Sequence, residues 1–490
     1  MSQRDPVFIG VDVGTSSVKA VIGSSGGDVI DDYTSTHATA RPSHGAAEQD
    51  PNVWMRHVGE ALVQFAAHPR AADVVAIGVT SQVNTHVFCD ANLQPLRPAI
   101  TWQDTRPGEH ASTLDGLLTE QTKIEALGAP IPIDASHALS RMAWLAHTDA
   151  AVWKATNHVL LPKDYIIARL TGVLSADPIS SIGLVGEDHS YASPVLDLVS
   201  RAADLLPSLI DPLSIVGTVT PDHPFAGTPV CCGTMDAWAS MFGLGVAADR
   251  QAMYLSGTSE VLGLISNQGV GYPGVITFPT WRGIRLHAGP TQSGGASLTW
   301  LSRLLGQEVS ALAGQAGDVS ITSDSPLFLP HLEGERAPLW DPISRASFAG
   351  LTSAHGPKDV AAAVMEGVAF SARLAIDAIE QSGCQDIQQL RHGGGGSASD
   401  VWCQIRANAL GRQLERVTSR HAGAMGALVM AAVASGELGG LSEATSSLIN
   451  TEKMFQPDPN HRIVADERFD RFRQLYEQLK PINMASVVTP

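Results

Sequence analysis

The chain has 490 residues, of which 44% are apolar, and this length and composition predict two or three domains with sizeable cores. Its 49 acidic residues outnumber 32 Lys and Arg residues, and the net charge of −17 argues against a nucleic-acid or anionic-membrane surface. Five cysteines without Cys-x-x-Cys spacing argue against a disulfide framework and a zinc site. No signal peptide and no apolar run near the ~18 residues of a membrane span is recognisable, so we expect a cytoplasmic protein.

The first predicted element is a β-hairpin with a polar tip. An apolar run that begins at Phe8 ends at Gly14-Thr15-Ser16, and a second apolar run follows from Val18 to Ile22. Such a tip offers backbone N–H groups and two hydroxyls, which suit a phosphate group. Asp12, just before the tip, is the predicted Mg²⁺ ligand, because Mg²⁺ is commonly held by one or two carboxylates plus water and substrate phosphates.

Further along the chain, strand-like runs alternate with helical patterns. Short buried strands are predicted over 74–80, 159–161 and 229–232, and helices over 51–67 and 358–379. This alternation indicates α/β layers with helices on both faces of the sheets. The alanine-rich stretch 421–434 requires no ligand, since its small residues let a helix pack closely.

Asp236 is the candidate catalytic residue. It follows the apolar strand 229–232 and a glycine turn, which places a carboxylate just beyond the C-terminal end of a strand, where open α/β sheets keep their sites. The alternative is that Asp236 only caps the N-terminus of the next helix.

The hairpin pattern occurs a second time almost half a chain later. An apolar strand from Ala252 ends at Gly257-Thr258-Ser259, and another apolar run follows from Val261 to Ile265. Gly-Thr-Ser is also a common turn sequence, but two strand-flanked copies favour a pair of hairpins that hold a nucleotide's phosphates from both sides. Gly243-Leu244-Gly245 precedes the second copy, so we expect the domains to span residues 1–245 and 246–490.

Two glycine-rich loops of the second half are candidates for the nucleotide side. Thr291 to Ser297 opens a predicted helix around Trp300, and Gly393 to Gly396 follows a strand-like run over 389–392. Glycines allow close approach of backbone to a flat base or ribose, although four of them also suit a flexible turn. The chain has no Gly-x-x-x-x-Gly-Lys-Ser/Thr motif of single-loop NTPases.

The segment Ser347-Phe348-Ala349-Gly350-Leu351, with Asp359 and a helix through Glu366, resembles the C-terminal signature of the FGGY carbohydrate kinase family. The stretch from Arg141 to Leu145 resembles the family's other signature imperfectly, and Leu160 to Tyr165 is similar to the xylulokinase branch. The resemblance runs nearly end to end. It implies an α/β fold of two actin-like and hexokinase-like (ribonuclease H-like) ATPase domains with a cleft between them.

The resemblance also implies a kinase that uses ATP and Mg²⁺, with Asp236 as the general base that accepts a proton from a sugar hydroxyl. It implies that domain closure assembles the site; the oligomeric state stays open, with a homodimer as one arrangement. The implied nucleotide-binding residues are Gly14, Thr15, Ser16, Lys19, Gly257, Thr258, Ser259, Gly294, Gly295, Gly394, Gly395 and Gly396. The implied sugar-binding residues are Gln82, Val83, Asn84, Trp102, Asp104 and Arg106.

Four positions depart from the family pattern. Xylulokinases carry Gln-Met-His-Gly where this chain has Gln82-Val83-Asn84-Thr85, and related kinases often have Asn where it has Ala237. From the resemblance we expect phosphorylation of a small ketose, and we expect a ketopentose such as D-xylulose to be the substrate. The alternative substrates are other ketoses and glycerol-like or erythritol-like polyols. Two other classes stay open on the sequence alone: a chaperone-like or filament-forming ATPase of the same fold, and a sugar-binding regulator.

Overall fold

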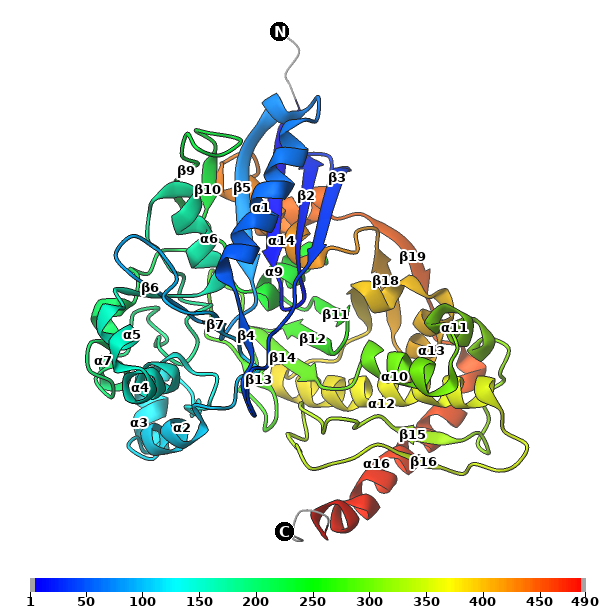
Figure 1. Ribbon diagram of the computed structural model, residues 1–490. Helices are drawn as coiled ribbons and strands as arrows, with labels where there is room; N and C mark the ends of the chain where they lie inside the picture. Colours follow the sequence, from blue (N-terminus) through cyan, green and yellow to red (C-terminus); the bar gives the residue numbers. More distant parts are fainter. Residues whose placement is uncertain (1–4, 486–490) are drawn as a thin grey trace. The chain divides into compact units, whose positions relative to one another are not determined.

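The structure is a computed structural model in which residues 5–485 are described. These residues divide into two compact units (Figure 1). The first contains residues up to Gly243 together with His421–Ile449, and the second contains Leu244–Arg420 together with the segment from Asn450 onward. The first unit ends at Gly243, close to the expected boundary at residue 245, and it also contains a segment from the expected second domain 246–490. The segment His421–Ile449 returns to the first unit.

The first unit is built around a six-stranded mixed sheet with strand order β3-β2-β1-β5-β10-β9. β1 pairs antiparallel with β2 and parallel with β5, as required for a hairpin at the centre of an α/β sheet. The strands are β1 (Val7–Val13), β2 (Ser17–Ser24), β3 (Val29–Thr36), β5 (Val74–Ser81), β9 (Ile215–Thr218) and β10 (Pro229–Cys231). The predicted hairpin and the predicted strands over 74–80 and 229–232 are thus confirmed within a residue.

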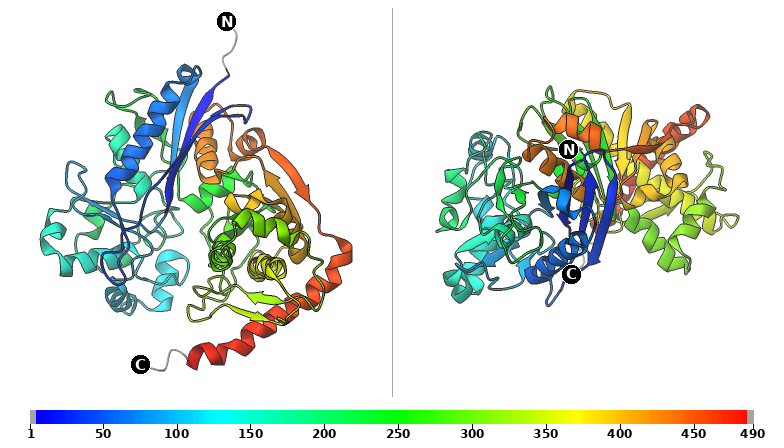
Figure 2. Two further views of the ribbon diagram at one scale, coloured as in Figure 1. Left: turned by 45° about the vertical axis from the view of Figure 1, so that its right-hand side comes forward. Right: turned by 90° about the horizontal axis from the view of Figure 1, so that it is seen from above.

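Helices cover both faces of this sheet (Figures 1 and 2). α1 packs on β2 and β3, α6 contacts β5 and β9, and α14 packs on β1 and β5 and also on α9. α1 begins after Asp50, whose side chain accepts a hydrogen bond from the Asn52 N–H, and buries an apolar stripe that includes Trp54, Val58 and Phe65. The helices are α1 (Pro51–Ala66), α6 (Pro162–Thr171), α9 (Asp236–Gly243), α14 (Ala422–Ala434) and α15 (Leu441–Leu448).

Glycines explain why α14 belongs to the first unit. A Cβ at Gly10 of β1 would overlap the backbone of Ala424, and one at Gly78 of β5 would overlap the carbonyl oxygen of Ala427. A Cβ at Gly426 of α14 would likewise overlap Ala239 of α9. The helix therefore packs backbone against backbone on the sheet and on α9, as the alanine-rich composition predicts.

The rest of the first unit is a set of short elements from β4 to α8, most of which enclose a second apolar core. They are β4 (Glu48–Gln49), η1 (Ala71–Asp73), β6 (Val87–Cys89), β7 (Ala99–Ile100), α2 (Gly108–Asp115), α3 (Glu120–Leu127), α4 (Ala138–Thr148), α5 (Ala150–Ala155), β8 (His158–Leu160), α7 (Ser193–Leu196) and α8 (Ala202–Leu205).

The second unit repeats the architecture with a seven-stranded sheet of order β13-β14-β12-β11-β17-β18-β19. α12 packs on β12 and β14, with α13 beside it. The strands are β11 (Ala252–Ser256), β12 (Glu260–Ile265), β13 (Ile276–Thr277), β14 (Leu286–Thr291), β17 (Gln389–Gly393), β18 (Gln413–Val417) and β19 (Thr451–Phe455), with the separate pair β15 (Leu327–Leu329) and β16 (Ser347–Ala349). The helices are α10 (Gly295–Leu305), α11 (Val309–Ala316), α12 (Pro357–Gly383), η2 (Gly395–Ala398), α13 (Asp400–Leu410), η3 (Pro459–His461) and α16 (Arg462–Ala485).

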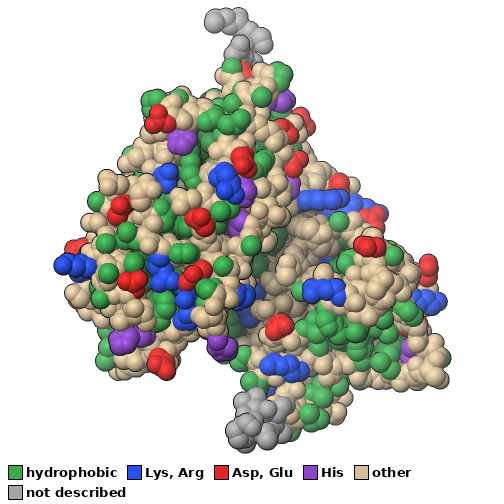
Figure 3. All heavy atoms as spheres, in the orientation of Figure 1, with side chains coloured by type: hydrophobic (Ala, Val, Ile, Leu, Met, Phe, Trp, Pro, Cys, Tyr) green, Lys and Arg blue, Asp and Glu red, His purple; other side chains and the backbone are tan. Residues whose placement is uncertain are grey.

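Charged side chains of both signs are interspersed on the face of the molecule that Figure 3 draws. Within the described residues, no helix is both long enough and apolar enough to cross a membrane.

Candidate functional site

The tip of the first hairpin is fixed by side chains from several elements. The Gly14 N–H donates to Ser17 O at 3.0 Å and closes the turn, while the Gly14 carbonyl accepts from His37 Nε2 at 3.1 Å. Gln49 Nε2 donates to Thr15 O at 2.7 Å, and Trp102 Nε1 donates to Thr15 Oγ1 at 3.1 Å. Neither His37 nor Gln49 was recognisable from the sequence, because each joins the tip only through the fold. These hydrogen bonds connect the tip to the segments of His37, Gln49 and Trp102.

Asp12 stands on β1 opposite Lys19 of β2. Its Oδ1 is buried and has no hydrogen-bond partner among the described residues. Burial raises the pKa of Asp12 to about 6, while the Lys19 charge acts in the opposite direction. A Cβ at Gly423 of α14 would overlap the Asp12 carboxylate, so that glycine makes room for it. A buried, unpartnered carboxylate oxygen fits a cation ligand.

Asp236 follows β10, just beyond the end of a strand as the sequence predicted, and is the first residue of α9. Its Oδ1 accepts from the Ala237 N–H at 2.8 Å. Burial raises the pKa of Asp236 to about 7, and the Asp12 carboxylate is the second cause of the rise. The structure thus brings together the two acids that the sequence separates by more than 200 residues.

A buried polar cluster supports the turn before Asp236. Thr234, two residues earlier, donates through Oγ1 to Asp177 Oδ1 at 2.9 Å, and its carbonyl accepts from Thr80 Oγ1 at 2.5 Å. Lys163 Nζ lies 2.9 Å from Asp177 Oδ2 and 2.5 Å from Asp164 Oδ1, with all three side chains almost completely buried. The cluster fixes the backbone from which α9 starts.

Two of the expected sugar-binding residues adjoin the first hairpin. Gln82 donates its backbone N–H to Val13 O at 3.0 Å and its Nε2 to Gln49 Oε1 at 3.0 Å, which leaves its buried Oε1 without a partner among the described residues. Trp102 is 37% exposed while it holds Thr15, so an apolar ring face is available next to the tip.

Asn84 has a left-handed backbone with φ 53°, which Asn tolerates better than most residues. Its Nδ2 donates to Ser136 Oγ at 3.2 Å. Its carbonyl accepts a hydrogen bond from the fully buried Arg141, whose Nη2 donates to Thr101 O at 2.5 Å and whose Nη1 contacts His86 Nδ1 at 2.6 Å. Arg141, noted in the sequence only within an imperfect signature, therefore joins the segments of Asn84 and Trp102.

Asp104 and Arg106 form an ion pair with each other. Arg106 Nη2 lies 2.6 Å from Asp104 Oδ2 and also 2.6 Å from Glu48 Oε1, and Asp104 Oδ2 accepts from the Ala47 N–H at 2.9 Å. Arg106 also stacks over the Trp144 ring, 4.6 Å from its centroid. These contacts occupy both side chains and give them a role in fixing the loop after β7.

In the second unit, the base of the second hairpin carries a buried network. The guanidinium of Arg406 on α13 donates to Ser256 Oγ at 2.7 Å, Glu260 Oε1 at 2.8 Å and Tyr254 Oη at 3.1 Å. Its Nη1 donates to the carbonyl of Gly396 at 2.8 Å. Arg406 therefore connects the glycine-rich loop after β17 to the hairpin. The sequence did not predict this connection, because the residues that form it lie far apart in the chain.

Close backbone packing explains most of the glycines in the nucleotide-side loops. A Cβ at Gly294 would lie 2.6 Å from Thr258 O, and one at Gly295 would lie 2.7 Å from Gly257 O. Gly394 has φ 90°, and its Cβ would lie 2.5 Å from Ser256 O. Both loops thus pack on the hairpin of Gly257 to Ser259. Gly395, where a Cβ would meet nothing within 4 Å, lies open.

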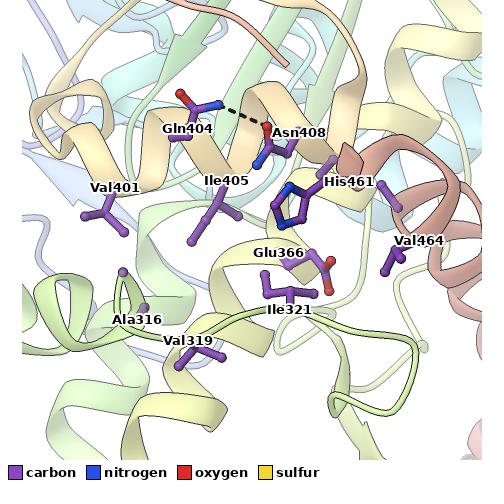
Figure 4. Close-up of a pocket in the computed structure, with 13 residues that line it drawn as sticks. Ala316, Val319, Ile321, Glu366, Val401, Gln404, Ile405, Asn408, His461 and Val464 are labelled. Carbon is purple, nitrogen blue, oxygen red and sulfur yellow. Dashed lines mark hydrogen bonds between the residues drawn. The ribbon is translucent and has the colours of Figure 1, made fainter. Parts of the chain in front are cut away.

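A cavity of about 280 Å³ opens between α11, α13 and the start of α16 (Figure 4). Its lining is mostly apolar, with Gln404 and Asn408 hydrogen-bonded to each other on one wall. Glu366 reaches this cavity but is ion-paired with Arg468 at 2.5 Å. None of the predicted site residues lines it.

The described residues contain no group of three or more His, Cys, Asp or Glu side chains arranged to hold a metal. A single carboxylate such as Asp12 suits Mg²⁺, which keeps several water ligands and binds substrate phosphates.

The architecture and the site define a sugar kinase: residues 7–243 match the N-terminal domain of the FGGY family of carbohydrate kinases, and residues 252–435 match its C-terminal domain. The chain belongs to this family, whose members use ATP, normally with Mg²⁺. The resemblance and the fold class predicted from the sequence are confirmed. The chaperone, filament and regulator alternatives are set aside by this assignment to carbohydrate kinases.

Named relatives cover nearly the whole chain. It is 30% identical over 488 residues to the xylulose kinase of Escherichia coli (strain K12), covering 97% of this chain and 100% of the relative. It is 25% identical over 478 residues to the gluconokinase of Bacillus subtilis (strain 168), covering 92% and 91%. The solved structure of a xyloylose kinase from Brucella ovis superposes with a TM-score of 0.84 at 27% identity, covering 97% of this chain and all of that one.

Proposed function

We propose that this protein transfers the γ-phosphoryl group of ATP to a hydroxyl of a small ketose, with D-xylulose as the first substrate to test. The observation that carries the proposal is the Asp236 carboxylate, which begins α9 just beyond β10 and whose pKa is raised to about 7 by burial and by the Asp12 charge. A sugar hydroxyl is a poor nucleophile, and a general base works best when its pKa lies near the working pH.

In this mechanism Asp236 accepts the proton of the attacking sugar hydroxyl. At the same time the bond between the γ-phosphorus and the oxygen of the leaving ADP loosens. Oδ1 of Asp236 is held by the Ala237 N–H, and the buried cluster around Asp177 fixes the turn that carries it. Positioning of the base and the hydroxyl supplies a large part of the rate enhancement in phosphoryl transfer.

Asp12 is the proposed Mg²⁺ ligand. Its buried, unpartnered Oδ1 supports this role, and a bound cation would offset the cost of burying the charge. Mg²⁺ held by Asp12 would supply positive charge that offsets the negative charge developing during phosphoryl transfer.

The two hairpin tips are the proposed phosphate contacts. Backbone N–H groups and hydroxyls of Gly14 to Ser16, with Lys19 nearby, supply one set, and those of Gly257 to Ser259 supply the other. The loops of Gly294 and Gly295 and of Gly394 to Gly396 are the proposed nucleotide contacts, supported by their packing on the second hairpin.

Sugar binding is assigned to Gln82, Val83, Asn84 and Trp102. The unpartnered Oε1 of Gln82 and the exposed ring of Trp102 support a pocket with an apolar wall and a few fixed polar groups. Asp104 and Arg106 stay in the proposal only as residues that shape the loop of Trp102, because their charges are satisfied by each other and by Glu48.

A coupled assay of ADP release with a substrate panel tests the proposal. The panel holds D-xylulose, L-xylulose, D-ribulose, D-fructose, glycerol, erythritol and gluconate, the last because a gluconokinase is among the relatives. We expect ADP release that depends on a ketose and is greatest for a ketopentose. Greatest turnover with gluconate or a polyol would contradict the assignment to ketoses, and ADP release independent of every member would contradict sugar phosphorylation.

A further inference from the structure

A partly buried arginine meets the tip of the second hairpin. Arg336 lies in the loop between β15 and β16, and its Nη2 donates to Ser259 Oγ at 3.2 Å and to the carbonyl of Thr291 at 2.6 Å. It therefore touches both the predicted phosphate tip and the end of β14, directly before the glycine-rich turn that opens α10. The sequence offered no signal for this residue, because it lies 77 positions from Ser259.

The guanidinium of Arg336 has unused hydrogen-bonding capacity. Its Nε is buried without a partner among the described residues, and no carboxylate there forms an ion pair with it. Burial lowers the pKa of Arg336, and the Glu335 charge acts in the opposite direction. Burying even part of a charge without an opposite charge beside it is costly, so buried charges in proteins are usually paired.

Two fully buried arginines of the same unit show the usual arrangement. Arg406 lies 2.8 Å from Glu260 Oε1, and Arg468 lies 2.5 Å from Glu366 Oε2. Arg336 differs from both, since the oxygens it reaches belong to a hydroxyl and a backbone carbonyl.

The neighbouring acid does not neutralise Arg336 by direct contact. Oε1 of Glu335 accepts hydrogen bonds from the backbone N–H groups of Gln292 and Arg336, and so holds the turn before Ser293. Its buried Oε2 faces His331 Nε2 at 3.8 Å. Glu335 thus fixes the backbone on which Arg336 and the turn before α10 stand, while the guanidinium is left for another partner.

We propose that Arg336 binds the phosphate chain of the nucleotide at the second hairpin and supplies the positive charge that this hairpin lacks. The inference rests on the proposed function and adds a residue to it. In a chain of net charge −17, a local cation is needed to attract a polyphosphate. The planar guanidinium can hold Ser259 through Nη2 and donate to a phosphate oxygen with its remaining N–H groups.

The test compares Arg336→Met and Arg336→Lys with a matched control, Arg285→Met. Arg285 lies just before β14, donates through Nη1 to the carbonyl of Gly269 and also has a buried Nε without a partner among the described residues. Calorimetric titrations with ADP, tripolyphosphate and adenosine, all in Mg²⁺ buffer, measure the binding. Circular dichroism melting identifies any variant that does not fold.

We expect Arg336→Met to weaken ADP and tripolyphosphate binding by about 10- to 100-fold, as for loss of a charge-assisted hydrogen bond. Arg336→Lys should show an intermediate loss because it keeps the charge but not the fork of donors, and Arg285→Met should bind as the wild type does. Adenosine binding should change less than twofold in all three.

Equal losses for ADP and adenosine would overturn the inference, because they would mean that Arg336 only shapes the loop. Unchanged ADP and tripolyphosphate binding in both Arg336 variants would overturn it as well. If the wild-type protein bound neither ADP nor tripolyphosphate, the proposed function itself would be wrong, and this inference with it.

Discussion

The charge of Asp12 on β1 acts on the carboxylate of Asp236 at the start of α9. Burial and then the Asp12 charge raise the pKa of Asp236 to about 7, while burial raises that of Asp12 to about 6. Two acids with raised pKa values, one of them just before the tip of the first hairpin, are typical of a functional site. The arrangement suits the two proposed roles: Asp236 as a base that accepts a proton, and Asp12 as a ligand of a cation.

Replacement of the proposed base, Asp236, should abolish most of the activity. Asp236→Asn keeps the shape of the side chain but cannot accept the hydroxyl proton, so we expect kcat to fall by about two to four decades. Sugar binding, measured by titration without nucleotide, should be kept. Asp149→Asn, at the N-cap of α5, is the control and should keep wild-type kcat. Near wild-type turnover of a folded Asp236→Asn protein would show that Asp236 is only a helix-start residue.

The same substitution should stabilise the protein at alkaline pH. The folded-state pKa of about 7 lies above the ordinary value of 3.8, so between these pH values the folded protein holds a proton that the unfolded chain has lost. Stability therefore decreases as the pH rises through this window. At pH 8 we expect the Tm of Asp236→Asn to exceed that of the wild type by roughly 2–4 °C. The difference should vanish near pH 4, and an equal difference at both pH values would refute the charge as its cause.

The proposed magnesium ligand predicts a separate phenotype. Asp12→Asn should raise the Mg²⁺ concentration needed for half-maximal activity at fixed ATP by at least tenfold, because the ion loses its carboxylate ligand. Sugar binding without nucleotide should not change. An unaltered magnesium titration curve would exclude Asp12 from the ligands of the ion.

The segment at Val83 and Asn84 should influence which sugar is accepted. We expect wild-type protein to use a ketose of different length or hydroxyl configuration at least as well as D-xylulose, since Asn offers a shorter donor and acceptor than His. Asn84→His is compatible with the φ of 53°, because His also tolerates the left-handed region. The measurement is kcat/KM across the substrate panel for wild type and for the Val83→Met, Asn84→His double variant. A strong wild-type preference for D-xylulose that the double variant leaves unchanged would mean that these positions are neutral.

The packing of α14 on the sheet can be tested through glycines. Gly78→Ala would place a Cβ against the Ala427 carbonyl, so we expect a loss of about 1–3 kcal/mol in the free energy of unfolding. Gly59→Ala in α1, where a Cβ meets nothing within 4 Å, should instead stabilise by roughly 0.5–1 kcal/mol. Urea unfolding of both variants gives the comparison. Equal effects would mean that α14 does not approach β5 as closely as described.

The sequence by itself determined the elements around the candidate site. The apolar runs on each side of Gly14 and Gly257 predicted both hairpins, and the strand and glycine turn before Asp236 predicted where that acid stands. These features are local: the alternation of apolar residues and the conformational freedom of glycine act over a few residues. Recognition of the family also depends on such short segments, since each is read directly from the chain.

Tertiary structure alone decided which distant groups meet. It returned His421–Ile449 to the first unit, because α14 can pack against Gly10 and Gly78 only where no Cβ intervenes. It also joined Glu48 to Arg106, joined Arg406 to the second hairpin and left Arg336 beside Ser259 without a carboxylate partner among the described residues. Such contacts depend on burial and on the geometry of segments far apart in the chain. A single sequence does not encode them in any local pattern.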